Sequence, residues 1–302
     1  FYDYASAAQL NFVSPVRRYL MENFDALVSI LSPFNLKELQ NVSPEKKRIV
    51  NIANAEIQKI HMHRSSEGKL KWVVCQYPCD AAAQESEMSL SEYTEFVFDS
   101  CYLFDKDPVA KWREVHNMQQ KIVDYLNGKK NVRYKGNDIE IEFSTAGRIW
   151  INSDGRCNMP SGEVFTGPVE DSVNGFIRFS YPAIFMGQEI EDISLEVKNG
   201  EVVSWGAKKG KDFLDQLFKI PGATRFGEAA IGTNYGIKKF TKNILFDEKL
   251  GGTIHMAVGA SYPNTGGKNE SSVHLDFIAD MKDNSEILAD GEVFYRNGKF
   301  LI

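Results

Sequence analysis

The hydrophobic pattern of the first hundred residues predicts strands separated by helices. Two short apolar runs, residues 25–31 and 70–75, have the length and the flanking turn residues of buried strands. Ser43 followed by Pro44 is a typical helix start, and the Ser-Leu-Ser-Glu sequence at 89–92 is a capping box that begins another helix. Strands that alternate with helices indicate an α/β layer.

The pattern changes after a helix predicted over residues 107–128, which begins with an Asp-Pro pair and ends at Asn-Gly. Residues 138–143 alternate between polar and apolar side chains, which is the period of a half-buried strand. Two-residue hairpin signals follow at Asn199-Gly200, Asp290-Gly291 and Asn297-Gly298. We therefore expect a mixed α/β (α+β) fold, with an N-terminal α/β domain at 1–106 and a strand-rich domain at 107–302.

The length and charge of the chain limit which classes of protein it can belong to. A chain of 302 residues fits two domains. The net charge is −6 and no basic tract stands out, which argues against a nucleic-acid partner. No apolar run approaches the roughly 20 residues that a membrane-spanning helix needs. The chain opens at Phe1 rather than Met, so we expect the first domain to be partial, with a segment missing upstream.

The four cysteines, Cys75, Cys79, Cys101 and Cys157, are scattered along the chain. This is not the disulfide framework of a small secreted protein. Cys75 and Cys79 have no second close pair with which to complete a zinc site. We interpret all four as ordinary thiols of a protein in the reducing cytoplasm.

Histidine is scarce, and His255 is one of two histidines in the strand-rich part. It belongs to a run at 251–259 bounded by glycines, in which Thr253, His255 and Ala257 share one face of a predicted strand. The apolar residues between them can pack into the core while the imidazole points elsewhere. Tyr262 follows in a loop whose glycines allow a close approach to another group.

The other histidine, His274, precedes Asp276 by two residues, so both side chains project from one face of a predicted strand at 272–277. An imidazole and a carboxylate in this arrangement could be two ligands of one metal ion. They could equally form a hydrogen-bonded pair without a metal.

Two acidic residues upstream stand among small and apolar residues: Glu163 follows Gly162, and Glu228 follows Gly227. A glutamate in such surroundings is costly to bury unless it is paired or binds a metal. An exposed glutamate at a strand edge would have the same local sequence, so the residues alone leave both possibilities open.

Several segments in order along the chain carry a family resemblance. They are Asn158-Met159-Pro160 to Pro168, Gly227-Glu228, Ile231 to Asn234, Asn243 to Lys249, Gly252 to His255, and Tyr262-Pro263 to Gly266-Gly267. Together they resemble the aminopeptidase T, aminopeptidase S and PepS family of metallopeptidases. The region from Met88 to Arg113 is also similar, so the resemblance extends over the whole chain.

The resemblance implies a dinuclear metal centre in the second domain, which would be the catalytic one. Carried over residue by residue, the ligands would be Glu163, Glu228, His255, Tyr262, His274 and Asp276, and all six are present. The family normally has a longer N-terminal segment, and it is dimeric. The resemblance therefore implies a homodimer that acts on peptides with a free N-terminus.

These side chains suit metal-assisted hydrolysis. Their oxygen and nitrogen donors fit two ions of zinc, cobalt or manganese, with a bridging carboxylate and a bridging water. The ions would lower the pKa of the water and hold the scissile carbonyl, and one would bind the α-amino group of the peptide. Glu163 or Glu228 could also serve as the general base. Tyr262 could be a ligand, could stabilise the oxyanion, or could simply pack against Pro263.

Two other functions stay open. Another dinuclear hydrolase could cleave a different amide or a phosphoester, with Lys238, Lys239, Lys242 and Lys268 near the motifs as cationic groups. A metal-stabilised binding or scaffold protein could use the same fold without catalysis. The segment 232–236 lacks the spacing and the Lys-Ser/Thr of a phosphate-binding loop, so we reject that reading.

Overall fold

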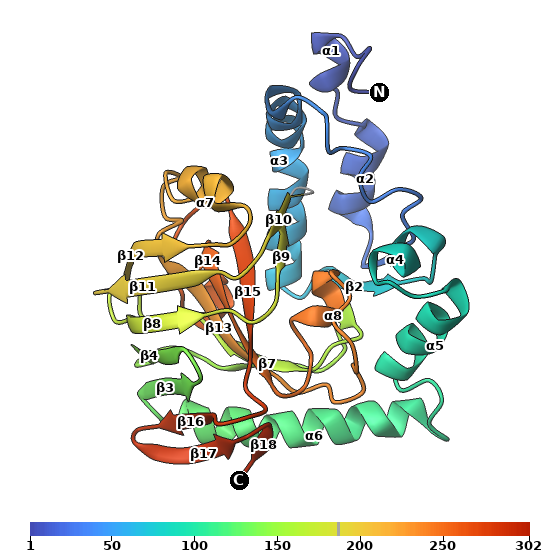
Figure 1. Cartoon of the computed structure of the whole chain (residues 1–302). Coiled ribbons are helices and arrows are strands. Elements are labelled where there is room, and N and C mark those ends of the chain that lie inside the picture. The colour runs from blue at the N-terminus through green and yellow to red at the C-terminus, as the bar shows by residue number, and fades with distance from the viewer. Residues whose placement is uncertain (186–187) are drawn as a thin grey trace.

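The computed structural model describes residues 1–185 and 188–302, which form a mixed α/β fold (Figure 1). The predicted fold class is therefore confirmed. In the view of Figure 1 the first helices of the chain lie at the top and α6 (Pro108–Asn127) runs along the bottom, with most of the strands between them.

The N-terminal part contains a small parallel sheet and several helices. Strand β1 (Ala26–Leu31) pairs with β2 (Lys71–Gln76), which pairs in turn with the short β6 (Asn158–Met159). The helices are α1 (Ala7–Leu10), α2 (Pro15–Asn23), α3 (Pro44–Ser66), α4 (Asp80–Glu85) and α5 (Leu90–Ser100). The strands and helices predicted for this part therefore form, close to their predicted bounds.

The prediction that residues 25–31 would form a buried strand is wrong about burial. In β1, the side chains of Val28 and Ile30 are exposed, Val28 to 62%. The strand lies at the edge of its sheet and hydrogen-bonds to β2. An apolar run predicts that a strand forms, but burial depends on what packs against its faces, and that is decided elsewhere in the chain.

The predicted domain boundary between residues 106 and 107 falls immediately before α6. Strand β6 comes from beyond this boundary, yet it joins the N-terminal sheet through the pairs Val74–Asn158 and Cys75–Met159. The two parts thus share a sheet, and the division into domains stays a prediction.

The largest sheet has eight strands in the order β12-β11-β8-β4-β3-β16-β17-β18. Their bounds are β3 (Asn131–Gly136), β4 (Ile139–Ser144), β8 (Asn174–Arg178), β11 (Ser194–Lys198), β12 (Glu201–Gly206), β16 (Glu286–Ala289), β17 (Glu292–Arg296) and β18 (Lys299–Phe300). Three of its hairpins turn at Asn199, Asp290 and Asn297, each with a positive φ, so the predicted two-residue turns are confirmed.

A five-stranded antiparallel sheet lies beside it, in the order β15-β14-β13-β7-β5. Its strands are β5 (Ile151–Ser153), β7 (Glu163–Thr166), β13 (Phe226–Gly232), β14 (Thr253–Gly259) and β15 (His274–Asp280). β13 and β14 are buried along their whole length. Ile254, Met256 and Val258 join the main hydrophobic core, which also includes Tyr134 and Ile141 of the eight-stranded sheet. The opposite face of β14, which carries His255, does not belong to this core.

A second, smaller hydrophobic core joins the N-terminal helices to the segment before β14. It contains Tyr93 and Val97 of α5 together with Leu245, Phe246 and Leu250 around α8 (Ile244–Asp247). The remaining elements are β9 (Ala183–Phe185), which pairs with β10 (Gln188–Ile190), the helix α7 (Lys211–Leu217) and the 3-10 helix η1 (Pro263–Thr265). The second core fixes the chain that leads into β14.

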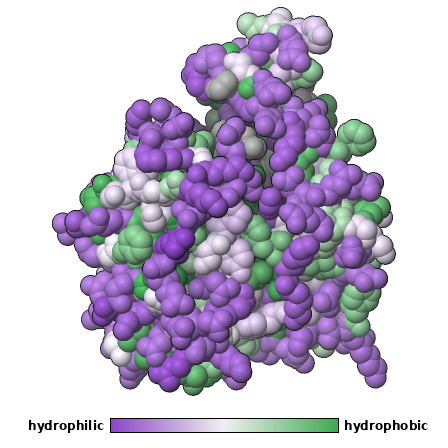
Figure 2. Space-filling model, in the orientation of Figure 1, coloured by the Kyte–Doolittle hydropathy of each residue, from purple (hydrophilic) through white to green (hydrophobic). Residues whose placement is uncertain are grey.

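The surface is mainly hydrophilic on the face shown in Figure 2, with smaller hydrophobic groups among the polar residues. Across residues 1–185 and 188–302, no helix is both long enough and apolar enough to cross a bilayer.

Candidate metal centre

Five of the six predicted site residues come together on one face of the five-stranded sheet, and Tyr262 lies in the loop after β14. Glu228 of β13 lies opposite Ala257 of β14, and Ala257 lies opposite Asp276 of β15. Cross-strand neighbours point to the same face of a sheet, so the two carboxylates flank a small alanine. His255 and His274 lie two residues before Ala257 and Asp276, and strand alternation places both imidazoles on that same face.

Small residues occupy the positions opposite three of the functional side chains: Ala230 opposite His255, Gly232 opposite Glu163 and Gly259 opposite His274. They leave room above the sheet for the larger polar groups. Gly227 has a separate role, because it lies in the bulge that precedes Glu228. A Cβ atom there would lie 2.3 Å from the carbonyl oxygen of Ala260, so only glycine fits.

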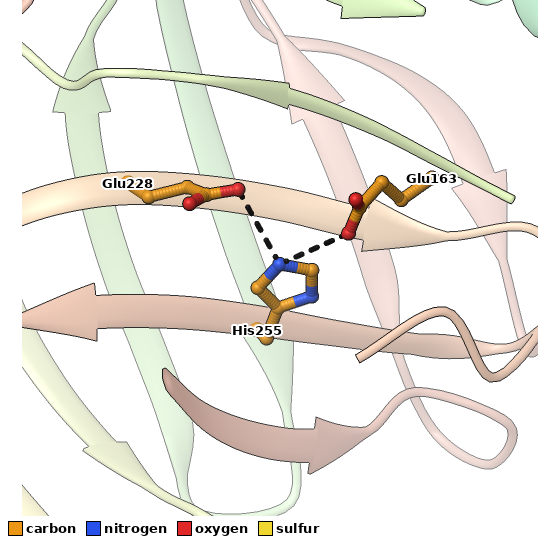
Figure 3. A group of neighbouring side chains, drawn as sticks. All are labelled: Glu163, Glu228 and His255. Atoms are coloured by element: carbon orange, nitrogen blue, oxygen red, sulfur yellow. Dashed lines mark ion pairs between the residues drawn. The ribbon is translucent and has the colours of Figure 1, made fainter. Parts of the chain in front are cut away.

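Glu163, Glu228 and His255 form the first group of candidate metal ligands (Figure 3). His255 Nε2 lies 3.3 Å from Glu163 Oε2 and 3.5 Å from Glu228 Oε1. The two carboxylates point toward the same ring nitrogen from either side. One ligand atom from each residue lies within 4.8 Å of the others, which is close enough for a shared ion.

Glu228, His274 and Asp276 form the second group. His274 Nε2 lies 3.1 Å from Glu228 Oε2 and 3.7 Å from Asp276 Oδ1. Its other ring nitrogen, Nδ1, donates a hydrogen bond to the carbonyl oxygen of Ala260 at 2.7 Å, which leaves Nε2 facing the carboxylates. Glu228 therefore belongs to both groups, with one oxygen toward each, and it could contribute a ligand atom to either.

A buried glutamine in α6 anchors the strand that carries Glu163. The amide nitrogen of Gln119 donates to the backbone carbonyl of Glu163 at 2.9 Å and to the Asn152 side chain at 2.8 Å. The Thr233 hydroxyl donates to its amide oxygen at 3.1 Å. A single glutamine in an amphipathic helix carries no sequence signal of such a role, and it was not predicted.

Several buried ligand atoms have no hydrogen-bond partner within the described part of the chain. They are Glu163 Oε2, both ring nitrogens of His255, and Asp276 Oδ1. Unpaired buried polar atoms are costly. Coordination of divalent cations would satisfy the carboxylate oxygens and Nε2 of His255, the ring nitrogen that faces Glu163 and Glu228. The mixed oxygen and nitrogen donors fit divalent metal ions of the first transition row.

The titration of the site shows how strongly it favours positive charge. Burial alone would raise the pKa of Glu228, but His255 and His274 outweigh this effect and lower that pKa. Burial alone would lower the pKa of each imidazole, but the surrounding carboxylates outweigh it and raise both values. Metal ligation requires neutral imidazoles, so protons and metal ions compete for this site.

Tyr262 lies at the rim of the centre and is 40% exposed. Its ring packs edge-on against the ring of His274, with 5.1 Å between centroids, and against Phe165 at 5.6 Å. Burial of the phenol and the charges of the nearby carboxylates raise the pKa of Tyr262. The phenol therefore keeps its proton and can donate a hydrogen bond.

Two charged residues of the site were not predicted to be functional, Glu248 and Lys249. Glu248 forms a third group of candidate ligands with His255 and Asp276. Lys249 is completely buried; it pairs with Glu248, and its Nζ lies 3.6 Å from Glu163 Oε1. The only signal in the sequence was their place in one of the segments that carry the family resemblance. Their spacing does not distinguish them from a solvated run of charges.

Comparison with known proteins identifies the family. The family model described as thermophilic metalloprotease (M29) matches residues 1–300. Aminopeptidase 2 of Geobacillus stearothermophilus is 30% identical to this chain, over 93% of this chain and 77% of that protein. Aminopeptidase T of Thermus thermophilus is 28% identical, over 80% of this chain and 67% of that protein. The resemblance drawn from the motifs is therefore confirmed.

Two solved structures share the fold. Wild-type AmpT from Thermus thermophilus matches with a TM-score of 0.84 at 24% identity, over 100% of this chain and 83% of the other. A 2,5-dihydroxypyridine dioxygenase from Pseudomonas putida KT2440 matches with a TM-score of 0.56 at 14% identity, over 98% of each chain. These likenesses concern the fold alone. Because the family model matches almost the whole chain, the chain belongs to the thermophilic metalloprotease (M29) family.

Proposed function

We propose that this chain is a metal-dependent aminopeptidase that releases the first residue of peptides with a free N-terminus. The observation that supports this function best is the convergence of buried, unpaired ligand atoms from Glu163, His255 and Asp276 around the shared Glu228. Membership of a metalloprotease family supports peptide hydrolysis, and the relatives are named as aminopeptidases.

We propose two ion positions. Glu163, Glu228 and His255 would hold one ion, and Glu228, His274 and Asp276 would hold the second, with zinc, cobalt or manganese as the metal. When bound, the ions would supply a water that ionises near neutral pH and would polarise the scissile carbonyl. A peptide amino group bound at one of these positions would limit cleavage to the first bond.

The remaining side chains would handle protons and charge. Tyr262 would donate a hydrogen bond to the carbonyl oxygen as it becomes negative. Glu248 has a side-chain exposure of 17%, against 7% for Glu163, so it is the more accessible carboxylate. We assign it the role of accepting a proton from the attacking water and returning it to the leaving amine.

The alternative of a phosphoesterase has less support. Such an enzyme would place cationic groups toward a substrate phosphate. Lys238, Lys239 and Lys268 are exposed, and Lys242 pairs with Glu189 at 2.9 Å. Lys249 is buried against glutamates and is not available to a substrate. A non-catalytic scaffold also has less support, because the relatives are named as aminopeptidases.

We also propose that the protein is a cytoplasmic homodimer. The family resemblance implies the dimer, and Cys75, Cys79, Cys101 and Cys157 are free thiols, which suits a reducing compartment. Light scattering on the purified protein would give twice the chain mass of 34.1 kDa if the dimer is correct, and the chain mass itself if it is not.

Elemental analysis combined with peptidase assays tests the proposed function. The wild type should contain or bind two divalent ions per chain and should release N-terminal residues from aminoacyl-nitroanilides and short peptides. Glu163→Gln and His255→Ala should lose both properties, whereas a phosphoester should not be cleaved. A wild type that binds ions but hydrolyses no N-terminal amide would support the scaffold instead.

A further inference from the structure

A completely buried lysine lies beside the proposed metal centre without a role in the function described so far. Lys249 follows α8 and is 0% exposed. Its backbone N–H donates to the carbonyl of Phe246 at 3.0 Å, and its carbonyl accepts from the N–H of Asn234 at 2.9 Å. The neighbouring Phe246 and Leu250 belong to the second hydrophobic core. The fold itself therefore sets the position of this side chain.

Two glutamates hold the Lys249 ammonium group. It forms a close ion pair with Glu248 Oε1, and it lies 3.6 Å from Glu163 Oε1. A buried charge is stable only when partners compensate it. The ammonium group thus occupies one oxygen of each glutamate and leaves the second oxygen of each for other contacts.

Glu163 and Glu228 use their two oxygens differently. Glu228 directs Oε1 toward His255 at 3.5 Å and Oε2 toward His274 at 3.1 Å, so each oxygen faces a different group of ligands. Glu163 directs Oε2 toward His255, and this oxygen has no hydrogen-bond partner among the described residues. Its Oε1 faces Lys249 instead. One carboxylate is thus arranged to bridge and the other to bind through a single oxygen.

We infer that Lys249 is a positioning residue that reserves Oε1 of Glu163, so that Glu163 binds its ion through Oε2 alone. A carboxylate that binds through one oxygen occupies one coordination position, whereas a chelating carboxylate occupies two. Catalytic metal sites keep a position open for water or substrate. Lys249 keeps that position free by holding the second oxygen away. This inference rests on the metal centre proposed above.

Loss of this positioning role has a consequence that loss of a purely structural lysine would not have. Replacing Lys249 by a neutral side chain releases Oε1 for chelation and also removes a positive charge close to the ions. Both changes favour ion binding while closing the open position. The variant should therefore bind ions at least as tightly as the wild type and turn over more slowly. Loss of a structural lysine would instead loosen the site and weaken ion binding.

The test uses metal-free wild type and Lys249→Met, each titrated with Co²⁺ by calorimetry and by visible absorption. We expect two ions for both proteins, with affinity in the variant equal to that of the wild type or up to about tenfold higher. The Co²⁺ absorption should be weaker in the variant, because it falls as coordination number rises. kcat should drop by about 10- to 100-fold, the usual range for a residue that orients a ligand.

Lys129→Met is the matched control. Lys129 is partly buried and pairs with Glu292 at 2.6 Å, but it lies by the eight-stranded sheet, away from the candidate ligands. This variant should match the wild type in ion binding, absorption and kcat. Weaker ion binding in Lys249→Met, or unchanged absorption together with unchanged kcat, would overturn the inference. A wild type that binds no ions would instead overturn the metal centre itself.

If Lys249→Met does not fold, the wild type provides a second test. A crystal structure with Mn²⁺ bound should show Glu163 on its ion through Oε2 alone, with Oε1 still in an ion pair with Lys249. Chelation of the ion by both oxygens of Glu163, with Lys249 turned away, would refute the inference.

Discussion

The five-stranded sheet and the three-stranded sheet differ in which kinds of side chain they bury. The five-stranded sheet buries ionisable groups such as Glu163, Glu228 and His255, whereas the three-stranded sheet exposes the apolar Val28 and Ile30. An apolar run was the signal for β1, whereas bounding glycines and the alternation of side chains indicated β14 and β15. The difference shows that a local pattern determines whether a strand forms, while the elements packed around it determine what it buries.

The comparison also shows where the molecule is sensitive to change. Buried charges depend on one another and on bound cations, so one substitution among them affects all of the others. Few other residues depend on an exposed apolar side chain at a sheet edge. Substitutions in the five-stranded sheet should therefore have large effects on activity or stability, and substitutions in β1 should have small effects on both.

The largest effect is expected from Glu228→Gln. Glu228 faces both groups of ligands, so its loss should abolish binding at both positions and lower kcat/KM by at least about a thousandfold, equivalent to roughly 4 kcal/mol. Metal content and hydrolysis of aminoacyl-nitroanilides would measure this. The exposed Glu292→Gln serves as the control and should leave both unchanged. Normal metal content in Glu228→Gln would contradict the proposed bridging role.

A core substitution tests the comparison by stability alone. Met256 of β14 is fully buried in the main core, so Met256→Ala should lower the free energy of unfolding by roughly 2–5 kcal/mol. Val28→Ala in β1 should change it by about 0.5 kcal/mol or less, because that side chain is mostly exposed. Urea unfolding of the two variants measures both. Similar losses of unfolding free energy in the two variants would show that the side chains of β1 contribute as much to stability as those of β14.

Metal removal should destabilise the five-stranded sheet specifically. Each ion present at a hundredfold its Kd should stabilise the folded state by about 2.7 kcal/mol, because it binds the folded chain and not the unfolded one. A chelator should therefore lower Tm, and zinc, cobalt or manganese should restore it together with activity. An unchanged Tm and full activity in the chelator would argue against a functional metal.

The smallest expected effect concerns the loop that carries Tyr262. Burial raises the pKa of Glu170, but the Lys268 N–H and the Arg148 guanidinium group outweigh this and lower it. A lowered pKa stabilises the fold above the unfolded value of about 4.3, and this contribution is lost as pH falls through the folded value. Glu170→Gln should thus lower the free energy of unfolding by about 1–2 kcal/mol at pH 7.

Denaturant unfolding at two pH values tests this sign. The difference between wild type and Glu170→Gln should shrink once pH falls below the unfolded value of about 4.3, and it should disappear as pH falls through the lower folded pKa. The exposed pair of Arg133 and Glu140 provides a control, since Glu140→Gln should have an effect of less than about 1 kcal/mol at either pH. An equal loss for Glu170→Gln at both pH values would show that its charge has no stabilising role.

Local signals predicted much of the fold. Asn199, Asp290 and Asn297 adopt the positive φ of the two-residue turns that their Asn-Gly and Asp-Gly pairs require. Such turns depend on two adjacent residues, so the local sequence is enough to predict them. The exposure of Val28 was not predictable in this way, because it depends on elements that are distant in the chain.

The residues of the candidate site also differ in whether their local sequence was enough to predict them. Strand alternation placed His274 beside Asp276 and left His255 free of the apolar face, so these residues were identifiable from their neighbours. Glu163 and Glu228 stood out only through the family resemblance, because an exposed glutamate has the same local sequence. Lys249 gave no sign of its burial, since that burial depends on the second hydrophobic core.

One measurement tests the central claim most directly: an anomalous difference map from crystals of the wild type grown with Mn²⁺. The account predicts two peaks, one among Glu163, Glu228 and His255 and the other among Glu228, His274 and Asp276. No peak on this face of the five-stranded sheet, or peaks only elsewhere on the molecule, would contradict it.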